Sequence, residues 1–210
     1  MSRPAVISIL DYDMANLRSV QKALEQVGAE ARIISRADEI ESSEKLVLPG
    51  VGAFMDAVAT LRARNLDGPI LRHIEKDRPL LGICLGLQIL FDVGYEDGEH
   101  RGLGVLRGKC VRFDVDATQG LKVPHMGWNQ LKIVEPNPSP LLAGLRPGCG
   151  VYFVHSYHVV PEDAAVIAAT TDYGGPFVSS IRRGNLFATQ FHPEKSQDAG
   201  LTILRNFAAI

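Results

Sequence analysis

One cysteine stands in a setting that suits a reactive thiol. Residues 78–91 read RPLLGICLGLQILF, an apolar run that leads into Cys84 and is followed by a helical pattern. Gly82 and Gly86 lie two positions on either side, which is the spacing of a turn that presents a nucleophile between a strand and a helix. The glycines fit because a Cβ at either flank would clash where strand and helix approach. The helix N-terminus would favour a thiolate, although burial of a small side chain is the competing explanation.

A histidine and a glutamate far downstream could serve as a base and the group that orients it. Residues 186–191 read as a strand, and His192-Pro193-Glu194 follows. Pro193 biases His192 toward an extended conformation, in which residues two apart face the same way. Glu194 could then accept from one ring nitrogen while the other faces outward, as in a base with its orienting group. A His-Pro turn with a solvated glutamate is the plain alternative, but chance explains this motif and the cysteine turn together poorly.

A glycine-rich turn could stabilise negative charge on a reacting carbonyl. Residues 45–48 read as a buried strand, and Pro-Gly-Val-Gly follows at 49–52. Gly50 and Gly52 would let the backbone direct an N–H at a developing oxyanion, and one such donor is worth about 10²–10³ in rate. An ordinary strand-to-helix turn accounts for the same residues without any chemistry.

The elements around these residues predict an α/β fold. Apolar runs at 5–10, 31–34, 45–48 and 80–83 alternate with helical patterns, which favours an open, mainly parallel sheet flanked by helices on both faces. Ligands of such sheets bind beyond the carboxyl ends of the strands. Cys84 and the 49–52 turn both lie at such ends, so we expect them to be neighbours.

The second half of the chain changes to short β-like runs. These predict an antiparallel extension of the sheet, with a tight hairpin at 182–186 and a last helix that begins near Asp198. The candidate strands are 111–115, 130–134, 151–154, 166–170 and 177–182. No linker interrupts the pattern, so residues 1–210 are expected to form one domain.

Composition excludes several classes of function. The formal net charge of −2 argues against nucleic acid or a membrane as the main partner. No run of about 18 apolar residues could span a bilayer, and the N-terminal residues read as a first strand and not as a signal peptide, so we expect a cytoplasmic protein. The three cysteines are widely spaced and predict no disulfide. His125, His155 and His158 do not have the spacing of a zinc site, so no metal or other cofactor is predicted.

Together the three motifs resemble those of the class I (triad) glutamine amidotransferases. The resemblance covers essentially the whole chain and implies an open α/β fold with a cysteine, histidine and glutamate triad. Within that family, residues 124–129 (PHMGWN) and 152–157 (YFVHSY) are similar to those of the glutaminase subunits of imidazole glycerol phosphate synthase. Asp11-Tyr12 and residues 16–20 point the same way. Trp128 and Tyr152 could belong to the core or to an interface.

The resemblance also implies a role for each site residue. Cys84 would attack the carboxamide of L-glutamine, His192 would act as base and then as acid, and Glu194 would orient His192. The backbone N–H groups of Gly52 and Leu85 would form the oxyanion hole.

Further residues are implied in holding the substrate. Gly50 and Gln88 would contact glutamine, and the backbone of His155-Ser156-Tyr157 would hold its amino-acid end. Gln88 could instead be an amide on a helix surface.

The resemblance implies a partner as well. The ammonia would pass to a separate cyclase subunit, in a heterodimer that makes imidazole glycerol phosphate and aminoimidazole carboxamide ribotide for histidine biosynthesis. Activity without the partner would be weak until the 49–52 turn is reshaped. Many relatives have glycine where this chain has Asp13 and Ala15, in a loop that the resemblance places near the cyclase.

Two other functions remain open from the sequence. The chain could be the glutaminase subunit of another synthase, such as pyridoxal phosphate or anthranilate synthase, although residues 155–157 and the 124–129 loop disfavour this. It could also be a catalytically silent module that only docks to a synthase, against which the intact triad argues.

Overall fold

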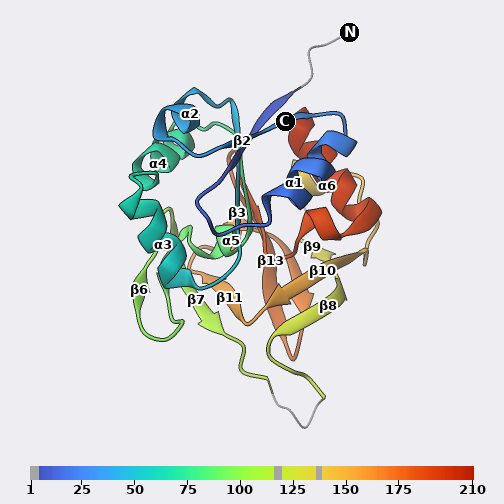
Figure 1. The fold of residues 1–210 in the computed structure, drawn as a ribbon. Helices are drawn as coiled ribbons and strands as arrows, with labels where there is room; N and C mark the ends of the chain where they lie inside the picture. Colours follow the sequence, from blue (N-terminus) through green and yellow to red (C-terminus); the bar gives the residue numbers. More distant parts are fainter. Residues whose placement is uncertain (1–4, 116–119, 136–138) are drawn as a thin grey trace.

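A large sheet runs through the computed structural model, which describes residues 5–115, 120–135 and 139–210 (Figure 1). Its first five strands are parallel, and the remaining pairs are antiparallel. In sheet order the strands are β2 (Glu30–Ile34), β1 (Val6–Leu10), β3 (Lys45–Gly50), β4 (Leu80–Cys84), β14 (Leu186–Thr189), β13 (Pro176–Arg183), β12 (Ile167–Asp172) and β9 (Lys132–Ile133). The predicted α/β class, with its antiparallel extension, is therefore confirmed.

Helices cover both faces of this sheet. Figure 1 shows α1 and α6 on one side, while α2, α3 and α4 lie on the other. The helices are α1 (Leu17–Gln26), α2 (Ala37–Ser42), α3 (Phe54–Ala63), α4 (Asp67–Glu75), α5 (Leu85–Gln88) and α6 (Gln197–Ala209), with short 3₁₀ turns at Pro140–Leu142, Ala164–Val166 and Pro193–Lys195. No helix in the described part of the chain is both long and apolar enough to cross a membrane.

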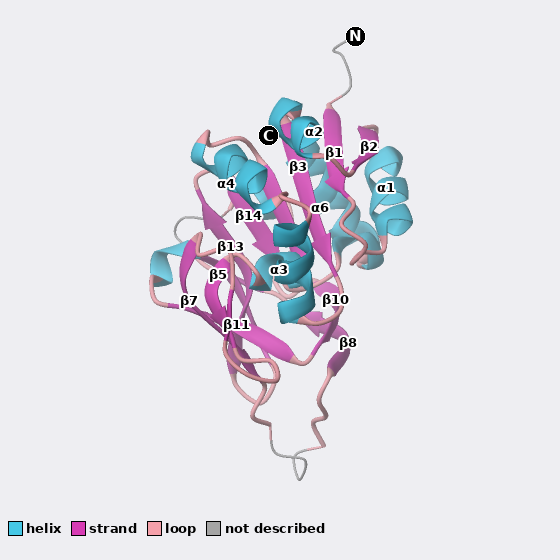
Figure 2. Cartoon of the chain, turned by 60° about the vertical axis from the view of Figure 1, so that its left-hand side comes forward, coloured by secondary structure: helices cyan, strands magenta, loops and turns pink. Residues whose placement is uncertain are grey.

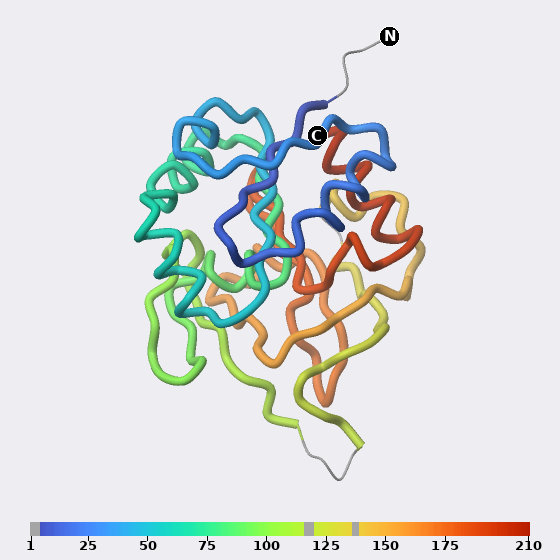
Figure 3. The backbone as a smooth tube through the Cα atoms, viewed as in Figure 1, coloured from blue at the N-terminus to red at the C-terminus, as the bar shows by residue number. Residues whose placement is uncertain are grey.

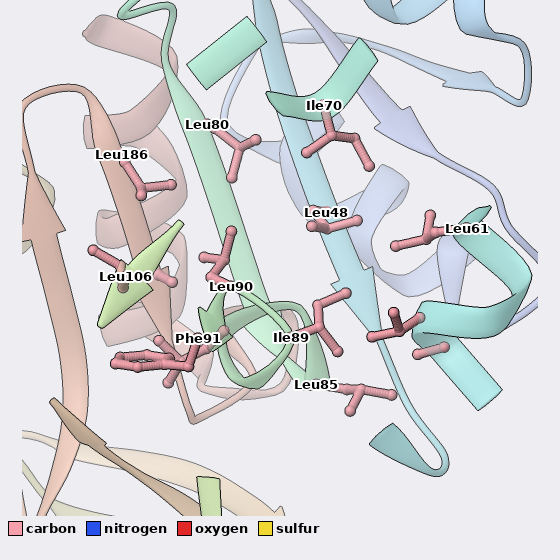
Figure 4. Close-up of a cluster of buried hydrophobic side chains, with 14 of the residues drawn as sticks. Leu48, Leu61, Ile70, Leu80, Leu85, Ile89, Leu90, Phe91, Leu106 and Leu186 are labelled. Carbon is pink, nitrogen blue, oxygen red and sulfur yellow. The ribbon is translucent and has the colours of Figure 1, made fainter. Parts of the chain in front are cut away.

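The two faces explain why the central strands are apolar throughout. In β3, Leu46 and Leu48 pack on the side of α3 and α4, whereas Val47 packs on the side of α1 and α6. Successive side chains of a strand point to opposite faces, so a strand covered on both sides needs an unbroken apolar run. Figure 4 shows the first of these clusters, with Leu48 and Leu80 from the strands against Leu61 and Ile70 from the helices.

Two small sheets lie near the carboxyl ends of the parallel strands (Figures 1 and 2). One pairs β10 (Gly150–His155) with β8 (His125–Gln130), and the other has the order β11-β7-β5-β6. The strands of the second sheet are β11 (Tyr157–Pro161), β7 (Leu106–Arg112), β5 (Phe91–Gly94) and β6 (His100–Arg101). These sheets build the outer wall of the site described below.

Several predicted boundaries are wrong. The strand expected at 111–115 is β7, which begins at Leu106 and ends at Arg112. Inward Leu106, Gly108 and Cys110 alternate with exposed charges, which is typical of a strand with one covered face and differs from the continuous apolar run of a fully buried strand. Residues 124–129 were expected to form a loop, but most of them form β8, which is held by its pairing with β10. The hairpin at 182–186 is confirmed, since β13 and β14 pair with only Gly184 and Asn185 between them.

Candidate active site

Cys84 ends β4 in a strained turn, as its flanking glycines predict. Its φ of 54° and ψ of −108° lie in a region that L-residues rarely adopt, and such strain is typical of nucleophile turns. A Cβ on Gly86 would collide with the carbonyl oxygen of Leu48, and one on Gly82 would lie 2.9 Å from the Gly86 oxygen. The predicted close approach of strand and helix is therefore present.

The helix after Cys84 is shorter than the sequence pattern suggests. It spans only Leu85–Gln88, and β5 begins at Phe91. The apolar residues between them pack into the core on all sides, so they satisfy a helical pattern without forming a helix (Figure 4). A single turn has few aligned peptide dipoles, so its dipole contributes less at the sulfur than a long helix would.

His192 and Glu194 form the predicted contact. Nδ1 of His192 lies 2.8 Å from Oε1 of Glu194, and the two side chains are 4% and 2% exposed. The reason given from the sequence is wrong in part, because His192 is extended but Pro193–Lys195 is a 3₁₀ turn. Since a carboxylate only accepts, Nδ1–H donates to Glu194, which leaves Nε2 for the thiol.

His192 and Cys84 come together although 108 positions separate them. β14 pairs with β4, and in Figure 3 the green stretch that holds Cys84 runs beside the orange-red stretch that leads to His192. Burial alone would lower the pKa of His192, but the Cys84 sulfur and the Glu194 carboxylate outweigh it and raise the pKa to about 10. Within the described residues Nε2 makes no well-aligned hydrogen bond, although the sulfur is near enough to affect its charge.

A cavity of about 350 Å³ opens at these residues. The predicted site residues that line it are Gly52, Cys84, Leu85, Gln88, His155, Ser156, Tyr157 and His192. Glu194 is buried and reaches the cavity only through His192.

Gly50, like Glu194, is a predicted site residue that does not line this cavity. A Cβ at this position would lie 2.5 Å from the Tyr12 hydroxyl and 2.9 Å from the Leu85 Cβ. Its surroundings therefore leave no room for a side chain, which gives Gly50 a packing reason to be glycine.

Gln88 is a buried part of the cavity wall, which excludes a helix-surface amide. Its Nε2 donates to the Tyr157 carbonyl at 3.0 Å and to Oε1 of Gln190 at 3.2 Å. Gln190 in turn donates from Nε2 to Sγ of Cys84 at 3.7 Å. The sequence analysis did not identify Gln190, although its position two residues before His192 places it on the same side of the strand.

Glu96 is a second residue that the sequence analysis missed. It lines the cavity, and its Oε2 accepts from the N–H of Phe54 at 2.7 Å, at the first turn of α3. No pattern marks it in the sequence, because it lies in a short acidic loop whose position depends on the small sheets. A carboxylate here can attract a positively charged group of a ligand.

The 49–52 turn has a left-handed glycine, as expected, and is tied to a neighbouring loop by the N–H of Val51. Gly52 has a φ of +103°, which few other residues adopt readily. The N–H of Val51 donates to the Met14 carbonyl at 2.7 Å, so it does not point into the cavity. Met14 thereby ties the turn to the loop after β1.

Asp13 is accommodated in that loop by a hydrogen bond to the side chain of Asp11 and by an ion pair with Arg64. Its φ of 69° is left-handed, which aspartate tolerates better than most residues. Oδ1 of Asp11 accepts from its N–H, and its carboxylate lies 2.9 Å from Arg64. The left-handed turn at this position is therefore open to aspartate.

Comparisons with known proteins decide the family. The model of the class-I glutamine amidotransferases matches residues 8–210. The HisH subunit of imidazole glycerol phosphate synthase from Syntrophotalea carbinolica is 56% identical over 205 residues, which cover 96% of this chain and 98% of that protein. The chain belongs to the class-I glutamine amidotransferase family, in its HisH branch.

Other relatives agree with this placement. The HisH subunit from Aquifex aeolicus is 54% identical over 95% of this chain and 94% of its own length. Among solved structures, a chain of PurLQS from Thermotoga maritima has a TM-score of 0.76 with 21% identity over 98% of both chains. At that identity only the amidotransferase fold is shared.

This amidotransferase also exposes large apolar side chains beside the site. Trp128 is 52% exposed and Met126 is 62% exposed, both on the outer face of β8, so Trp128 is not a core aromatic. Between residues 5 and 210, leaving out 116–119 and 136–138, no cluster of three His, Cys, Asp or Glu side chains is arranged to hold a metal ion.

Proposed function

We propose that this chain is the glutaminase subunit of an imidazole glycerol phosphate synthase. It hydrolyses L-glutamine to glutamate and ammonia, and the ammonia passes to a separate cyclase subunit in histidine biosynthesis. The names of the relatives support the pathway. The observation that carries the activity is the convergence of a strained cysteine and a His192–Glu194 pair on one cavity.

In the first step Sγ of Cys84 attacks the carboxamide carbon of glutamine. A C–S bond forms, and the carbonyl π electrons move to oxygen, where backbone N–H groups stabilise the oxyanion. The protonated Nε2 of His192 then gives its proton to the amide nitrogen, the C–N bond breaks and ammonia leaves. Glu194 keeps the other ring nitrogen protonated and the ring in place throughout.

Hydrolysis of the thioester completes the cycle. His192, now neutral, takes a proton from water as the water oxygen bonds to the thioester carbon. The C–S bond breaks, glutamate is released and the thiolate–imidazolium pair is restored. The cycle consumes one water molecule, which gives a proton to His192 and its hydroxyl group to the carboxyl group of glutamate.

Two side chains of the cavity suit the polar ends of glutamine. The carboxylate of Glu96 matches the α-ammonium group, and Gln88 lies one helical turn beyond the nucleophile with its amide held by Tyr157. The Glu96 carboxylate and the Gln88 amide are partly shielded from water, which strengthens their interaction with a bound ligand.

The proposed partner has a defined task at the 49–52 turn. The Val51 N–H, next to the proposed oxyanion donor Gly52, is engaged by the Met14 carbonyl at 2.7 Å, so this bond must be released before the turn can change shape. We expect a cyclase docked on the face that carries Trp128 and Met126 to favour that movement. The isolated chain is then a weak glutaminase.

A glutaminase assay with and without the cyclase subunit and its nucleotide substrate tests the proposal. The expected result is glutamate release that rises at least about tenfold with the partner, in line with the value of an oxyanion donor. Equal rates with and without the cyclase would contradict the role of the turn. Stimulation by another synthase only, or no release under any condition, would contradict the proposed function.

A further inference from the structure

A chain of hydrogen bonds runs behind the cavity wall and ends on Tyr157. It begins at Asn129, whose Nδ2 lies 3.3 Å from Nε2 of His125. Nδ1 of His125 lies 3.1 Å from Nε2 of His155, and Nδ1 of His155 lies 2.7 Å from the Tyr157 carbonyl oxygen. The two histidines face each other in the register of β8 and β10, and 3% and 6% of their surfaces are exposed.

The direction of every hydrogen bond in this chain follows from the groups at the two ends of the chain. A carbonyl only accepts, so Nδ1 of His155 carries the hydrogen that is given to Tyr157. At the other end, Oδ1 of Asn129 accepts from the Gln130 N–H at 2.8 Å, while its Nδ2 donates to the Asp172 carbonyl at 2.8 Å. The amide orientation is therefore fixed, and Asn129 presents a donor to His125.

Both rings are neutral, which leaves one arrangement of hydrogens. Burial lowers the pKa of His155 to about 3 and that of His125 to about 4. A neutral His155 with hydrogen on Nδ1 must accept at Nε2, so His125 donates from its own Nδ1 and accepts from Asn129 at Nε2. All members then donate in the same direction, toward the cavity.

The acceptor at the end of this chain is shared with the cavity. The Tyr157 carbonyl also accepts from Nε2 of Gln88, whose second hydrogen goes to Gln190 beside the Cys84 sulfur. We infer that His125 and His155 are positioning residues, which hold the Tyr157 carbonyl and through it the Gln88 amide where glutamine would bind. This inference rests on the proposed function, because it concerns the same cavity.

Aromatic contacts keep the two rings from taking other positions. The ring of His125 stacks on Phe153 and Tyr173, with centroids 4.7 and 4.0 Å apart. The ring of His155 packs on Phe113 at 5.1 Å. A ring held on both faces can rotate little, so its hydrogen-bonding edge has a defined direction.

Two substitutions of one residue separate positioning from packing. In His155→Asn the amide nitrogen replaces Nδ1 and can still donate to Tyr157, whereas His155→Gln places its amide near the former Nε2 and cannot. We expect His155→Gln to raise the KM for glutamine about tenfold with kcat changed less than about threefold, and His155→Asn to keep KM within about threefold of wild type, the range that one hydrogen bond accounts for. Circular dichroism checks that each variant is folded.

His158 provides a matched control in the same cluster. Its ring packs on Phe113 at 4.8 Å but takes no part in the chain of donors. His158→Phe should keep KM within about twofold, since it changes packing alone. Equal KM values for His155→Asn and His155→Gln, or an equally large effect of His158→Phe, would overturn the inference.

The tautomers can be measured without any activity. Two-dimensional ¹⁵N spectra of the imidazoles in the wild-type chain should show both His125 and His155 neutral with hydrogen on Nδ1. Hydrogen on Nε2 of either ring, or a charged ring at neutral pH, would overturn the inference. A wild-type chain that shows these tautomers but releases no glutamate with the cyclase would instead count against the proposed function.

Discussion

The pKa of His192 is set by three influences, of which one lowers it and two raise it. Burial disfavours its charge, while the Cys84 sulfur and the Glu194 carboxylate both favour it and prevail. The result is a ring that holds a proton ready for the departing ammonia. Its own exposure is so small that solvent screens neither neighbour effectively.

The charge on His192 should depend on Cys84. In wild type the pKa is raised to about 10, so the ring contributes stability that is fully present below its unfolded pKa of about 6.5 and is lost as the pH rises toward 10. Cys84→Ala removes one of the two neighbours that favour the charged ring and should lower the pKa of His192. The ring signals of His192 followed by NMR from pH 5 to 10 measure this, and an unchanged titration in the variant would exclude the coupling.

Glu194 should matter for turnover more than for binding. The neutral amide of Glu194→Gln cannot stabilise the imidazolium, and it can turn its NH₂ group toward Nδ1, where an acceptor is needed. We therefore expect kcat to fall by about 10²–10⁴ while KM changes little. Glu99→Gln, on the exposed loop after Glu96, is the matched control and should be neutral. A loss of less than threefold in Glu194→Gln, measured with the cyclase present, would rule out its orienting role.

Some of the elements that carry the site can be predicted from the sequence more clearly than others. β3, β4 and the β13–β14 hairpin follow from unbroken apolar runs and from a two-residue turn, and the structure has them in those places. The strained turn at Cys84 follows from its two glycines. These predictions succeed because they depend on residues close together in the chain.

The predictions that fail depend on distant contacts. β8 lacks the β-branched residues that favour strands, and it forms because β10 pairs with it in register. Glu96 reaches the cavity through the placement of a whole loop, so no local pattern marks it, and Gln190 contacts Cys84 because β14 pairs with β4. The contact of Glu194 with His192 was predicted, but through an extended segment where the structure has a 3₁₀ turn.

The strand-to-helix turn should tolerate no side chain at Gly86. A Cβ there would meet the backbone oxygen of Leu48, which belongs to β3 and cannot move freely. Gly86→Ala should lower the free energy of unfolding by about 1–3 kcal/mol, as overpacking does elsewhere. Urea unfolding measures the change.

Gly150 is the matched control for that substitution. A Cβ on Gly150 would make only an ordinary contact, at 3.6 Å from the Trp128 ring. Gly150→Ala should therefore change stability by less than about 0.5 kcal/mol. Equal effects at the two positions would show that backbone crowding does not shape the nucleophile turn.

The molecule as a whole combines a rigid sheet with a wall of buried imidazoles at one end. Two apolar clusters fix the sheet between its helices, and the small sheets add β8, β10 and β11 beyond its strand ends. The site lies between these parts. Its geometry therefore depends on how the outer wall rests on the sheet, and the neutral histidines in that wall make the fit sensitive to acid.

Stability should fall as the solution becomes acidic. The pKa of His155 is about 3 when folded and about 6.5 when unfolded, so between these values the unfolded chain binds more protons and acid favours unfolding. His155 should contribute a slope of about 1 kcal/mol per pH unit near pH 5, allowing for partial screening. Urea unfolding of wild type and His155→Asn at pH 7 and pH 5 tests this, because the variant should lose less stability than wild type.

The most direct test of the whole account is the site of the covalent intermediate. The chain, saturated with the cyclase subunit, is mixed with L-glutamine and quenched in acid, and its peptides are examined by mass spectrometry. The account predicts one glutamyl group, attached as a thioester to Cys84, and no glutamate release by Cys84→Ala. Glutamine hydrolysis at the wild-type rate by Cys84→Ala, or a glutamyl group on another residue, would contradict it.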